Sequence, residues 1–559
     1  MFLPVTKEEI QKFGWDKPDI ILISGDTYID SPFIGTAVIG NWLTAHGFKV
    51  AVIAQPDINN DDIARLGEPS LFWGVSAGAM DSFVSNYTAL NKFRNDDDLT
   101  PGGVNNKRPD RACMVYTNLI RKYFKNTKPI VLGGVEASLR RIVHYDFKDN
   151  ALRRSILFDA KADILTYGMT EQSSLELAKA LKNGTEWRNI RGLCYISKEK
   201  PENSFEIPSY EECADDKDKF FEAFSSFYKN ETAREPKVLC QKHAERYLVQ
   251  NPRQQVLTTE ELDAIYDLDY TREVHPYYAK LGKVKAQDTI KFSITTHRGC
   301  FGECNFCSIA VHQGKEVVSR SEKSVIAEAE KITKLKDFKG YITDLGGPTA
   351  NMYAAKCRTN KNAGVCENKR CLFPETCKNL IPGHNKQLEL LEKVSRIEGV
   401  KKVFISSGIR YDIICADSEN GQNYLDNLLE KHISGQMKIA PEHCDDKVLA
   451  LMGKPSSAVL KQFLEMFKNS KENSSLPFLT YYFIAAYPGC GEKEMFNLQR
   501  FIGRNLKINP EQVQIFTPTP STVATMIYYC EKDLSGNKLF VEKDRNNKQK
   551  QKRTILGVK

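Results

Sequence analysis

Three cysteines near the middle of the 559-residue chain, Cys300, Cys304 and Cys307, are spaced C-x3-C-x2-C. They follow residues 290–294, an alternating run that is typical of a strand. Three thiolates on one tight loop suit a cubane [4Fe-4S] cluster, because they hold three irons and leave the fourth without a protein ligand. That open iron would be a site for chemistry.

The loop resembles the signature of the radical S-adenosylmethionine (SAM) superfamily, and residues 295–309 look closer still to its uncharacterised YgiQ-type family. The resemblance implies that the amino and carboxylate groups of SAM chelate the open iron. It also implies that the reduced cluster cleaves SAM to methionine and a 5′-deoxyadenosyl radical, which abstracts a hydrogen atom from a substrate that the family does not identify. An electron donor such as flavodoxin or ferredoxin is the implied partner.

Two other interpretations of the loop are a zinc site and a redox pair. A structural zinc site favours four nitrogen or sulfur ligands in a closed shell, whereas this loop offers three cysteines with His297 before them. A redox pair formed by Cys304 and Cys307 would need a thioredoxin-like βαβ context, which the sequence lacks here. The spacing and the strand before it favour the iron-sulfur interpretation.

A second group of cysteines, Cys357, Cys366, Cys371 and Cys377, is spaced C-x8-C-x4-C-x5-C within residues 352–382. This insertion is rich in Lys, Arg and Asn and too polar to build its own core, which favours a metal staple. A four-cysteine zinc site and an auxiliary iron-sulfur cluster both fit, and free or partly paired thiols are a further alternative.

The elements that must position these groups alternate between helix and strand over residues 286–525. Six strands are predicted, at residues 290–294, 340–345, 402–407, 436–440, 478–484 and 512–516. Six strands match the partial (β/α)6 barrel of radical SAM enzymes. Chemistry in a parallel barrel takes place at the carboxyl ends of the strands, so residues there are the candidates to contact SAM.

By resemblance and position, the candidate cofactor contacts are Phe306, Gly346, Gly347, Ser407, Arg410 and Glu442. Gly346 and Gly347 match the turn that holds the SAM amino group in relatives. Pro348 stands where relatives often have Glu, so backbone carbonyls are expected to make that contact. Arg410 can form a forked bond to a carboxylate. No residue is assigned a direct catalytic role.

Residues 1–197 alternate between strand and helix, which predicts a parallel, flavodoxin-like α/β domain. The domain resembles the cobalamin-binding type that often precedes a radical SAM barrel. It lacks the Asp-x-His-x-x-Gly pattern that supplies a histidine to cobalt, although some relatives bind cobalamin without it. We therefore expect substrate docking or packing, rather than cobalamin binding, as its role.

The remaining segments carry fewer signals. Residues 198–285 read as a connecting helical segment, and residues 526–559 as a basic, solvated tail that could touch nucleic acid. No apolar run is long enough to span a membrane, and no signal peptide is evident, so the expected location is the cytoplasm. The 15 cysteines fit a reducing compartment better than a disulfide framework.

The sequence thus supports two hypotheses from different classes. The first is a radical SAM enzyme that cleaves SAM at a [4Fe-4S] cluster and acts on an unknown substrate. The second is a non-catalytic iron-sulfur or zinc protein that binds a partner such as RNA.

Overall fold

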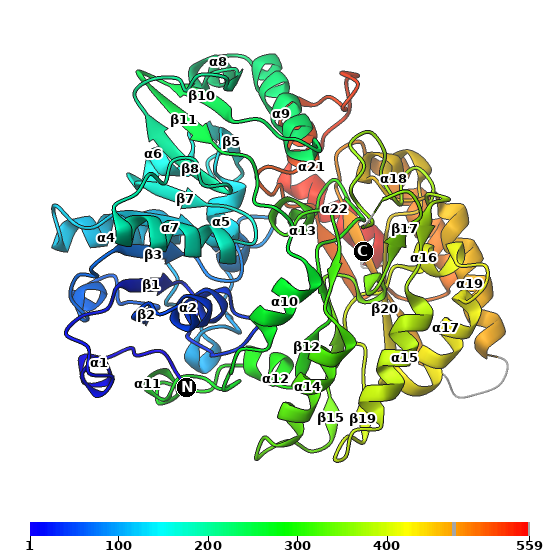
Figure 1. Ribbon diagram of the computed structural model, residues 1–559. Coiled ribbons are helices and arrows are strands. Elements are labelled where there is room, and N and C mark those ends of the chain that lie inside the picture. Colours follow the sequence, from blue (N-terminus) through cyan, green and yellow to red (C-terminus); the bar gives the residue numbers. More distant parts are fainter. Residues whose placement is uncertain (361, 472–476, 557–559) are drawn as a thin grey trace. The chain divides into compact units, whose positions relative to one another are not determined.

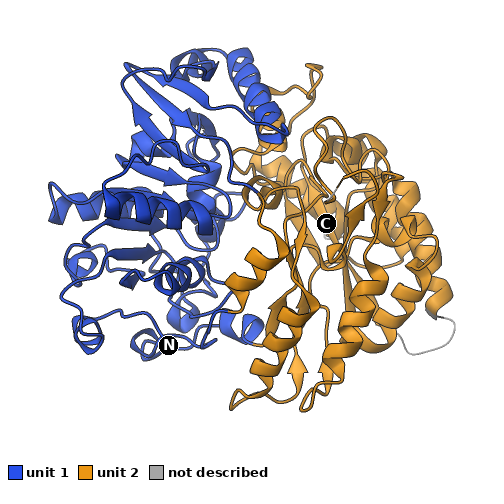
Figure 2. Cartoon of the chain, viewed as in Figure 1, with its two compact units in different colours: residues 1–255, 268–291 blue, residues 256–267, 292–559 orange. Residues whose placement is uncertain are grey.

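The computed structural model describes residues 1–360, 362–471 and 477–556, which form two compact units (Figure 2). Unit 1 comprises residues 1–255 and 268–291, and unit 2 comprises residues 256–267 together with the chain from residue 292 onward. The chain therefore passes between the units three times, and α10 (Thr259–Tyr266) belongs to unit 2 although its neighbours in sequence belong to unit 1.

Unit 1 is built on one nine-stranded sheet with the order β2-β1-β3-β4-β7-β8-β11-β10-β9 (Figure 1). Its parallel half consists of β1 (Ile20–Ser24), β2 (Val50–Ala54), β3 (Phe72–Ser76), β4 (Ile130–Gly133) and β7 (Ile164–Thr166). Every residue of β1 and β2 is buried, as expected for parallel strands that are covered on both faces. The order of these five strands is that of flavodoxin-like sheets, so the predicted fold class is confirmed.

The helices of unit 1 cover this sheet. The main ones are α2 (Gly35–Ala45), α4 (Ala112–Tyr123), α6 (Ile156–Ala160), α7 (Glu171–Asn183) and α9 (Lys217–Thr232). The shorter ones are α1 (Lys7–Lys12), α3 (Ser82–Asn86), α5 (Gly134–Leu139), α8 (Tyr210–Asp215), α11 (Pro276–Ala279) and α12 (Ala286–Ile290). Helix α2 packs with α7, and α4 packs with α6. The chain leaves β1 toward one edge through α2 and leaves β3 toward the other through α4, which puts these helices on opposite faces if both crossovers are right-handed.

The segment expected to connect the domains differs from that expectation, because it extends the sheet. Strands β9 (Phe205–Ile207), β10 (Leu239–His243) and β11 (Arg246–Gln250) join it through β8 (Leu193–Ser197). The strand pattern of this segment is hard to recognise in the sequence, because two of its buried residues are glutamines. Gln241 accepts from the Val143 amide at 2.9 Å, and Gln250 accepts from Arg141 at 3.0 Å, so polar residues occupy positions inside the fold.

A buried ion pair lies beside the carboxyl ends of β1 and β3. Arg108 pairs with Asp26, which directly follows β1, and its Nη1 lies 3.1 Å from Asp97. The side chain of Arg108 is 1% exposed. Asp26 also accepts from the Ala79 amide at 2.5 Å, so this cluster ties three loops together at one edge of the sheet.

Unit 2 contains the six predicted strands in a consecutive, parallel series. They are β12 (Ser293–Thr295), β15 and β16 (Tyr341–Ile342 and Asp344–Gly346), β19 (Lys402–Val403), β20 (Gln436–Glu442), β21 (Phe478–Ala485) and β22 (Gln512–Ile515). Each pairs in parallel with the next: β12 with β16, β15 with β19, β20 with β21, and β21 with β22. A parallel bridge between Ile409 and Ile439 joins the two halves. This series fits the partial barrel predicted from the sequence.

The helices of unit 2 follow the strands as a chain of neighbours. They are α14 (Glu322–Thr333), α15 (His384–Ser395), α17 (Gly421–Asn427), α19 (Ser457–Lys471), α20 (Glu492–Phe501) and α22 (Arg545–Leu556). Helices α14, α15, α17 and α19 pack successively, and α20 packs with α22. Shorter helices α16 (Tyr411–Ala416), α18 (Asp446–Met452) and α21 (Val523–Cys530) lie after β19, β20 and β22 in the chain.

The C-terminal segment, residues 526–559, was expected to be a basic, solvated tail, and helix α22 within it differs from that expectation. Helix α22 packs against α20 and β22. Gln551 is buried and accepts from the Ala486 amide at 2.9 Å, while Lys548 donates to the Tyr528 hydroxyl at 2.9 Å. The last three residues of the expected tail lie outside the described residues.

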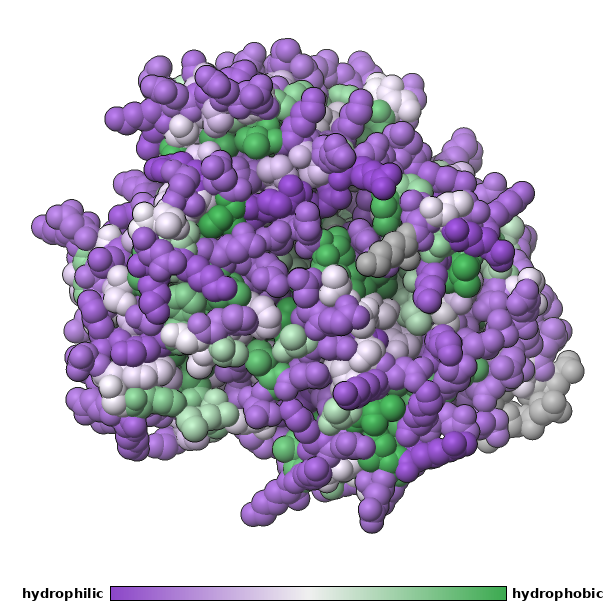
Figure 3. Space-filling model, in the orientation of Figure 1, coloured by the Kyte–Doolittle hydropathy of each residue, from purple (hydrophilic) through white to green (hydrophobic). Residues whose placement is uncertain are grey.

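The face shown in Figure 3 is mainly hydrophilic, with small hydrophobic patches scattered over it. Among the described residues, no helix combines the length and the hydropathy that a membrane span requires.

The buried ion pair of unit 1 gives a stability prediction. Replacing Arg108 with Ala leaves Asp26 and Asp97 buried without their cation, so unit 1 should lose about 3–5 kcal/mol of unfolding free energy. The chain's four tryptophans (Trp15, Trp42, Trp73 and Trp187) all lie in unit 1, so denaturant unfolding followed by tryptophan fluorescence measures this loss.

The matched control is Arg121→Ala, which removes the half-exposed ion pair with Asp163 in the same unit. Surface pairs contribute about 1 kcal/mol or less, so the midpoint should move little. Equal shifts for the two variants would contradict the importance given to the buried pair.

Candidate functional site

The three-cysteine loop lies between β13 (His297–Arg298) and α13 (Ser308–His312). It therefore follows the carboxyl end of β12, where a parallel barrel places its chemistry. Cys307 is the N-cap residue of α13, and β13 pairs with β14 (Val318–Ser319) to close the base of the loop.

Asn305 fastens this loop to two other parts of unit 2. Its amide donates to the Met452 carbonyl at 2.9 Å, and its side chain donates to the Leu451 carbonyl at 2.8 Å. Its own carbonyl accepts from the Ala524 amide at 2.8 Å. The middle of the loop is thus fixed to α18 and α21, which are both far away in sequence.

The three thiols of the loop are partly buried and lie close enough to influence one another. Burial raises the pKa of the Cys300 thiol, and the neighbouring Cys304 raises it further while Arg410 opposes the change. Burial, together with Cys304 and Cys300, raises the pKa of Cys307 to about 12. Three thiolates gathered here repel one another, so a cationic centre that binds all of them would stabilise the charged forms.

Arg410 connects the loop to the end of β19. Its Nη1 donates to Cys304 Sγ at 3.2 Å, while its Nε donates to Asp412 at 2.8 Å and its Nη2 to the other oxygen of the same carboxylate. Burial disfavours the charge of Arg410, but Asp412 and Cys304 outweigh it, so the pKa of the guanidinium is raised. The forked bond expected with a ligand carboxylate is made to Asp412 instead.

Glu442 lies at the end of β20 in the same environment. Burial raises the pKa of its carboxyl group, opposed by Lys454 and Arg410, and its charge in turn raises the pKa of Cys307. Its backbone has φ of +67°, beside an irregularity in the pairing of β20 with β21. A left-handed conformation at a non-glycine residue costs free energy, and such strain is common at functional sites.

The close packing around β16 leaves no room for a side chain at Gly346 or Gly347. A Cβ on Gly347 would lie 2.5 Å from the His297 ring, and one on Gly346 would lie 2.5 Å from Ser407 Oγ. The Gly346 carbonyl already accepts from the Thr296 amide at 2.7 Å and from its hydroxyl at 3.0 Å. The structure therefore brings Gly346 next to Ser407, and any side chain at these glycines would enter occupied space.

The structure also places the two remaining candidates. Ser407 donates its hydroxyl to Asp344, whose other oxygen accepts from the Ser406 amide at 2.8 Å. Phe306 lies on the cysteine loop, and its ring meets the ring of Tyr487 edge-on at 6.2 Å between centroids. All six candidate contacts thus lie on the cysteine loop or at the carboxyl ends of β16, β19 and β20.

Sequence reasoning missed the residues that position these candidates. Asn351 is 1% exposed and exchanges two hydrogen bonds of 2.9 Å with the Arg410 backbone. Asp344 holds the turn at Ser407, and Thr349 Oγ1 lies 3.6 Å from Cys300 Sγ. Their only sequence signal is that they stand within a few residues of Gly346, at the end of a predicted strand.

Within the described ranges, no group of three or more His, Cys, Asp or Glu residues is arranged to hold one metal ion. A cubane places a different requirement on its ligands, because each thiolate binds its own iron atom and the sulfurs stand apart. The loop of Cys300, Cys304 and Cys307, with Arg410 donating to one sulfur, fits that group.

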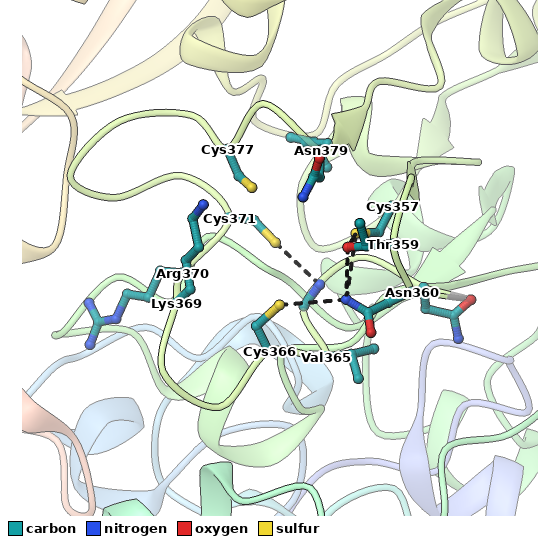
Figure 4. Close-up of a pocket in the computed structure, with 13 residues that line it drawn as sticks. Cys357, Thr359, Asn360, Val365, Cys366, Lys369, Arg370, Cys371, Cys377 and Asn379 are labelled. Atoms are coloured by element: carbon teal, nitrogen blue, oxygen red, sulfur yellow. Dashed lines mark hydrogen bonds between the residues drawn. The ribbon is translucent and has the colours of Figure 1, made fainter.

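The second cysteine group surrounds a small cavity (Figure 4). Cys357, Cys366, Cys371 and Cys377 line a space of about 40 Å³. All four are free thiols. The structure thus brings together the four cysteines that the sequence grouped.

A larger, open cavity of about 1100 Å³ lies beside both cysteine groups. Its wall includes Asn305 of the first loop and Cys377 of the second group. The charged residues of the wall are Lys369, Arg370, Lys378, Lys447, Glu375 and Asp533. Positive charge therefore predominates around a space large enough for a sizeable small molecule.

In unit 1, ligands of such a sheet would bind in the crevice where the strand order reverses, between β1 and β3. The Arg108–Asp26 pair lies at this edge of the sheet. Gly25 approaches the facing loop so closely that a Cβ there would lie 2.2 Å from the Ala77 carbonyl oxygen. The chain's own groups therefore occupy part of this crevice.

Comparisons with known structures show the same fold. The cobalamin- and [4Fe-4S]-bound structure of TsrM, a radical SAM methyltransferase from Kitasatospora setae, has a TM-score of 0.50 over 94% of this chain and 83% of that one. The aqua-cobalamin-bound structure of OxsB, a cobalamin-dependent SAM radical enzyme, gives a TM-score of 0.51 over 94% of this chain and 57% of that one. Sequence identity is 12% in both cases, so the likeness concerns the fold.

Comparisons of sequence identify relatives over the whole length. A UPF0313 protein of Fusobacterium nucleatum is 56% identical over 99% of this chain and 98% of its own length. A UPF0313 protein of Thermotoga neapolitana is 46% identical over 100% of this chain and 99% of its own length. The family model described as "Radical SAM N-terminal" matches residues 2–293. The chain therefore belongs to the UPF0313 proteins, the YgiQ-type family of radical SAM proteins.

Proposed function

We propose that this protein is an enzyme that reductively cleaves SAM at a [4Fe-4S] cluster bound by Cys300, Cys304 and Cys307. The observation that carries the proposal is the gathering of these thiols with Arg410 and Glu442 at the carboxyl ends of neighbouring barrel strands. Family membership and the shared fold support the same chemistry. When bound, the cluster would supply the electron for cleavage, from a donor such as flavodoxin or ferredoxin.

The chain's own residues would orient the reactants and exclude water. Asn305 keeps the cysteine loop in place, and Asn351 fixes the backbone of Arg410, so the guanidinium stays against Cys304. Hydrogen bonds to cluster sulfurs tune the reduction potential, which makes Arg410 a positioning and tuning residue rather than a ligand to SAM. Gly346, Gly347, Ser407 and Phe306 are proposed to border the bound SAM.

The substrate is proposed to enter through the cavity of about 1100 Å³, because Asn305 of the cysteine loop forms part of its wall. The excess of lysine and arginine there favours an anionic substrate. Untargeted comparison of metabolites and modified RNA from cells with and without the protein tests this idea. Accumulation of only neutral or cationic compounds in cells that lack the protein would contradict it.

Unit 1 is proposed to serve docking or packing rather than cobalamin binding, although the TsrM and OxsB structures contain cobalamin. The ion pair of Arg108 and Asp26 beside the β1/β3 crevice supports this view. Equilibrium dialysis of the protein with hydroxocobalamin, followed by absorbance, should show no retained corrinoid. One equivalent retained would refute the proposal for unit 1.

The competing hypothesis is a non-catalytic iron-sulfur or zinc protein that binds a partner such as RNA. Helix α22 in the basic C-terminal segment packs against α20 and β22, which argues against this helix serving as a free binding arm. An assay of SAM cleavage by anaerobically reconstituted and reduced protein distinguishes the enzyme hypothesis from the binding hypothesis. The enzyme should release 5′-deoxyadenosine from SAM, and no release from protein with an intact cluster would leave the binding hypothesis.

The first prediction for the site concerns its ligands. In Cys304→Ala protein, the first cluster should be lost or left as a labile remnant, because a three-thiolate site has no spare ligand. The measurements are iron and sulfide content, and 5′-deoxyadenosine formation, which should fall to background. Cys415→Ala is the matched control, since Cys415 is a partly buried thiol of unit 2 outside both cysteine groups. Full SAM cleavage by Cys304→Ala would disprove the ligand assignment.

The second prediction concerns Arg410. Arg410→Gln removes the charged donor to Cys304 Sγ, so the cluster should persist with a lower reduction potential. The electron donor should then reduce the cluster less readily, which slows SAM cleavage. Redox titration followed by electron paramagnetic resonance measures the potential. Arg504→Gln, which removes an exposed positive charge from the same unit, should leave it unchanged. An unaltered potential in Arg410→Gln would argue against the proposed role.

A further inference from the structure

The second cysteine group is built into the fold, although its sequence is polar. A short antiparallel ladder between β17 (Lys356–Cys357) and β18 (Leu380–Ile381) joins the two ends of the insertion, and Cys357 pairs with Leu380 in it. The Cys377 amide donates to the Cys371 carbonyl at 2.8 Å, and the Leu380 amide donates to the Cys377 carbonyl at 2.9 Å. Together with the β17–β18 ladder, these bonds connect the backbone at Cys357, Cys371 and Cys377.

The fourth cysteine, Cys366, is held by contacts with the segment that follows the first cysteine loop. Lys315 Nζ donates to the Cys366 carbonyl at 2.7 Å, and the Val317 amide donates to the Ala363 carbonyl at 3.4 Å. Gly364, with φ of +92°, approaches so closely that a Cβ there would lie 2.1 Å from the Lys315 carbonyl oxygen. The insertion is therefore docked against the chain near the first loop.

Nitrogen donors already point at the sulfurs of this group. The Gly364 amide donates to Cys371 Sγ at 3.3 Å. Asn360 Nδ2 donates to Cys357 Sγ at 3.7 Å and to Cys366 Sγ at 3.6 Å (Figure 4). One amide group thus stands between two sulfurs from different parts of the insertion. N–H donors to sulfur stabilise thiolates and are part of the surroundings of iron-sulfur clusters.

Zinc and an iron-sulfur cluster place different demands on four thiolates. A four-cysteine zinc site needs all its sulfurs about 2.3 Å from one ion, which draws them close together. Here they stand around a cavity of about 40 Å³, and no three side chains among the described residues converge on a single ion. A cubane has four irons, each bound by one thiolate, and so suits four sulfurs that surround a space.

We propose that Cys357, Cys366, Cys371 and Cys377 bind a second [4Fe-4S] cluster, with one thiolate on each iron. All four irons would then carry a protein ligand, so this cluster would have no open position for SAM. The site is separate from the one that holds the proposed chemistry, and its existence does not depend on SAM cleavage.

The surroundings of the second site connect it with the first. Cys371 belongs to a hydrophobic cluster that includes Phe301 and Leu372, and Cys300 of the first loop packs against that cluster. Cys377 also lines the cavity of about 1100 Å³ that Asn305 borders. An iron-sulfur cluster here would stabilise the wall of the cavity through which we propose that the substrate enters. The hydrophobic side chains around Phe301 would lie between it and the first set of thiols.

The test counts iron and acid-labile sulfide in full-length protein reconstituted anaerobically with iron and sulfide. Native protein should hold about eight of each per chain, and the triple variant Cys300→Ala/Cys304→Ala/Cys307→Ala about four. The quadruple variant Cys357→Ala/Cys366→Ala/Cys371→Ala/Cys377→Ala should also hold about four and should retain the signal of the first cluster. The double variant Cys415→Ala/Cys444→Ala removes two thiols outside both groups and should match native protein.

Two results would overturn the proposal. One is about four irons in native protein with none in a triple variant whose circular dichroism is native. The other is one equivalent of zinc that disappears in the quadruple variant, which would make the site a zinc staple. Mössbauer spectroscopy of native protein enriched in ⁵⁷Fe provides a second test if a variant does not fold. The unique iron that responds to added SAM should make up about one eighth of the total iron signal if two clusters are present, and about one quarter if only the first is present. Formation of 5′-deoxyadenosine by native protein reports separately on the first site.

Discussion

The contact between Arg410 and Cys304 is the interaction on which the proposed site depends. A buried guanidinium needs a carboxylate, and Asp412 supplies one two residues further along the chain. With the Nε–Nη2 edge of its planar group bound there, Arg410 directs Nη1 at the sulfur, at 3.2 Å. This geometry joins the end of β19 to a loop that begins more than a hundred residues earlier. Asn351, which follows β16, holds the backbone of Arg410 and so adds a third strand end to the same arrangement.

Close backbone and ring contacts explain why small residues stand around this centre. The His297 ring occupies the space that a Cβ of Gly347 would need, and Ser407 occupies that of Gly346. The left-handed backbone of Glu442 is the opposite case, because a charged residue keeps a conformation that glycine would adopt at lower cost.

Two segments differed from the expectation for one shared reason. In β10, β11 and α22, glutamine or lysine side chains occupy buried positions, where hydrogen bonds from distant residues satisfy them. Gln241 meets the amide of Val143, and Gln551 meets that of Ala486. A buried polar group without a partner costs free energy, so sequence reasoning assigns such residues to the surface. The partners are separated by 98 and 65 residues, and only folding brings them together.

The sequence by itself determined the features that depend on local pattern. Buried runs such as Ile20–Ser24 and Val50–Ala54 specify parallel strands, and the C-x3-C-x2-C spacing puts three thiols on one loop whatever the rest of the chain does. The tertiary structure decided what those thiols meet. It used the fork of Arg410 for Asp412, placed Asn305 between α18 and α21, and arranged four cysteines of a polar insertion around one cavity. These outcomes depend on distances between residues far apart in the chain, and local periodicity contains no information about them.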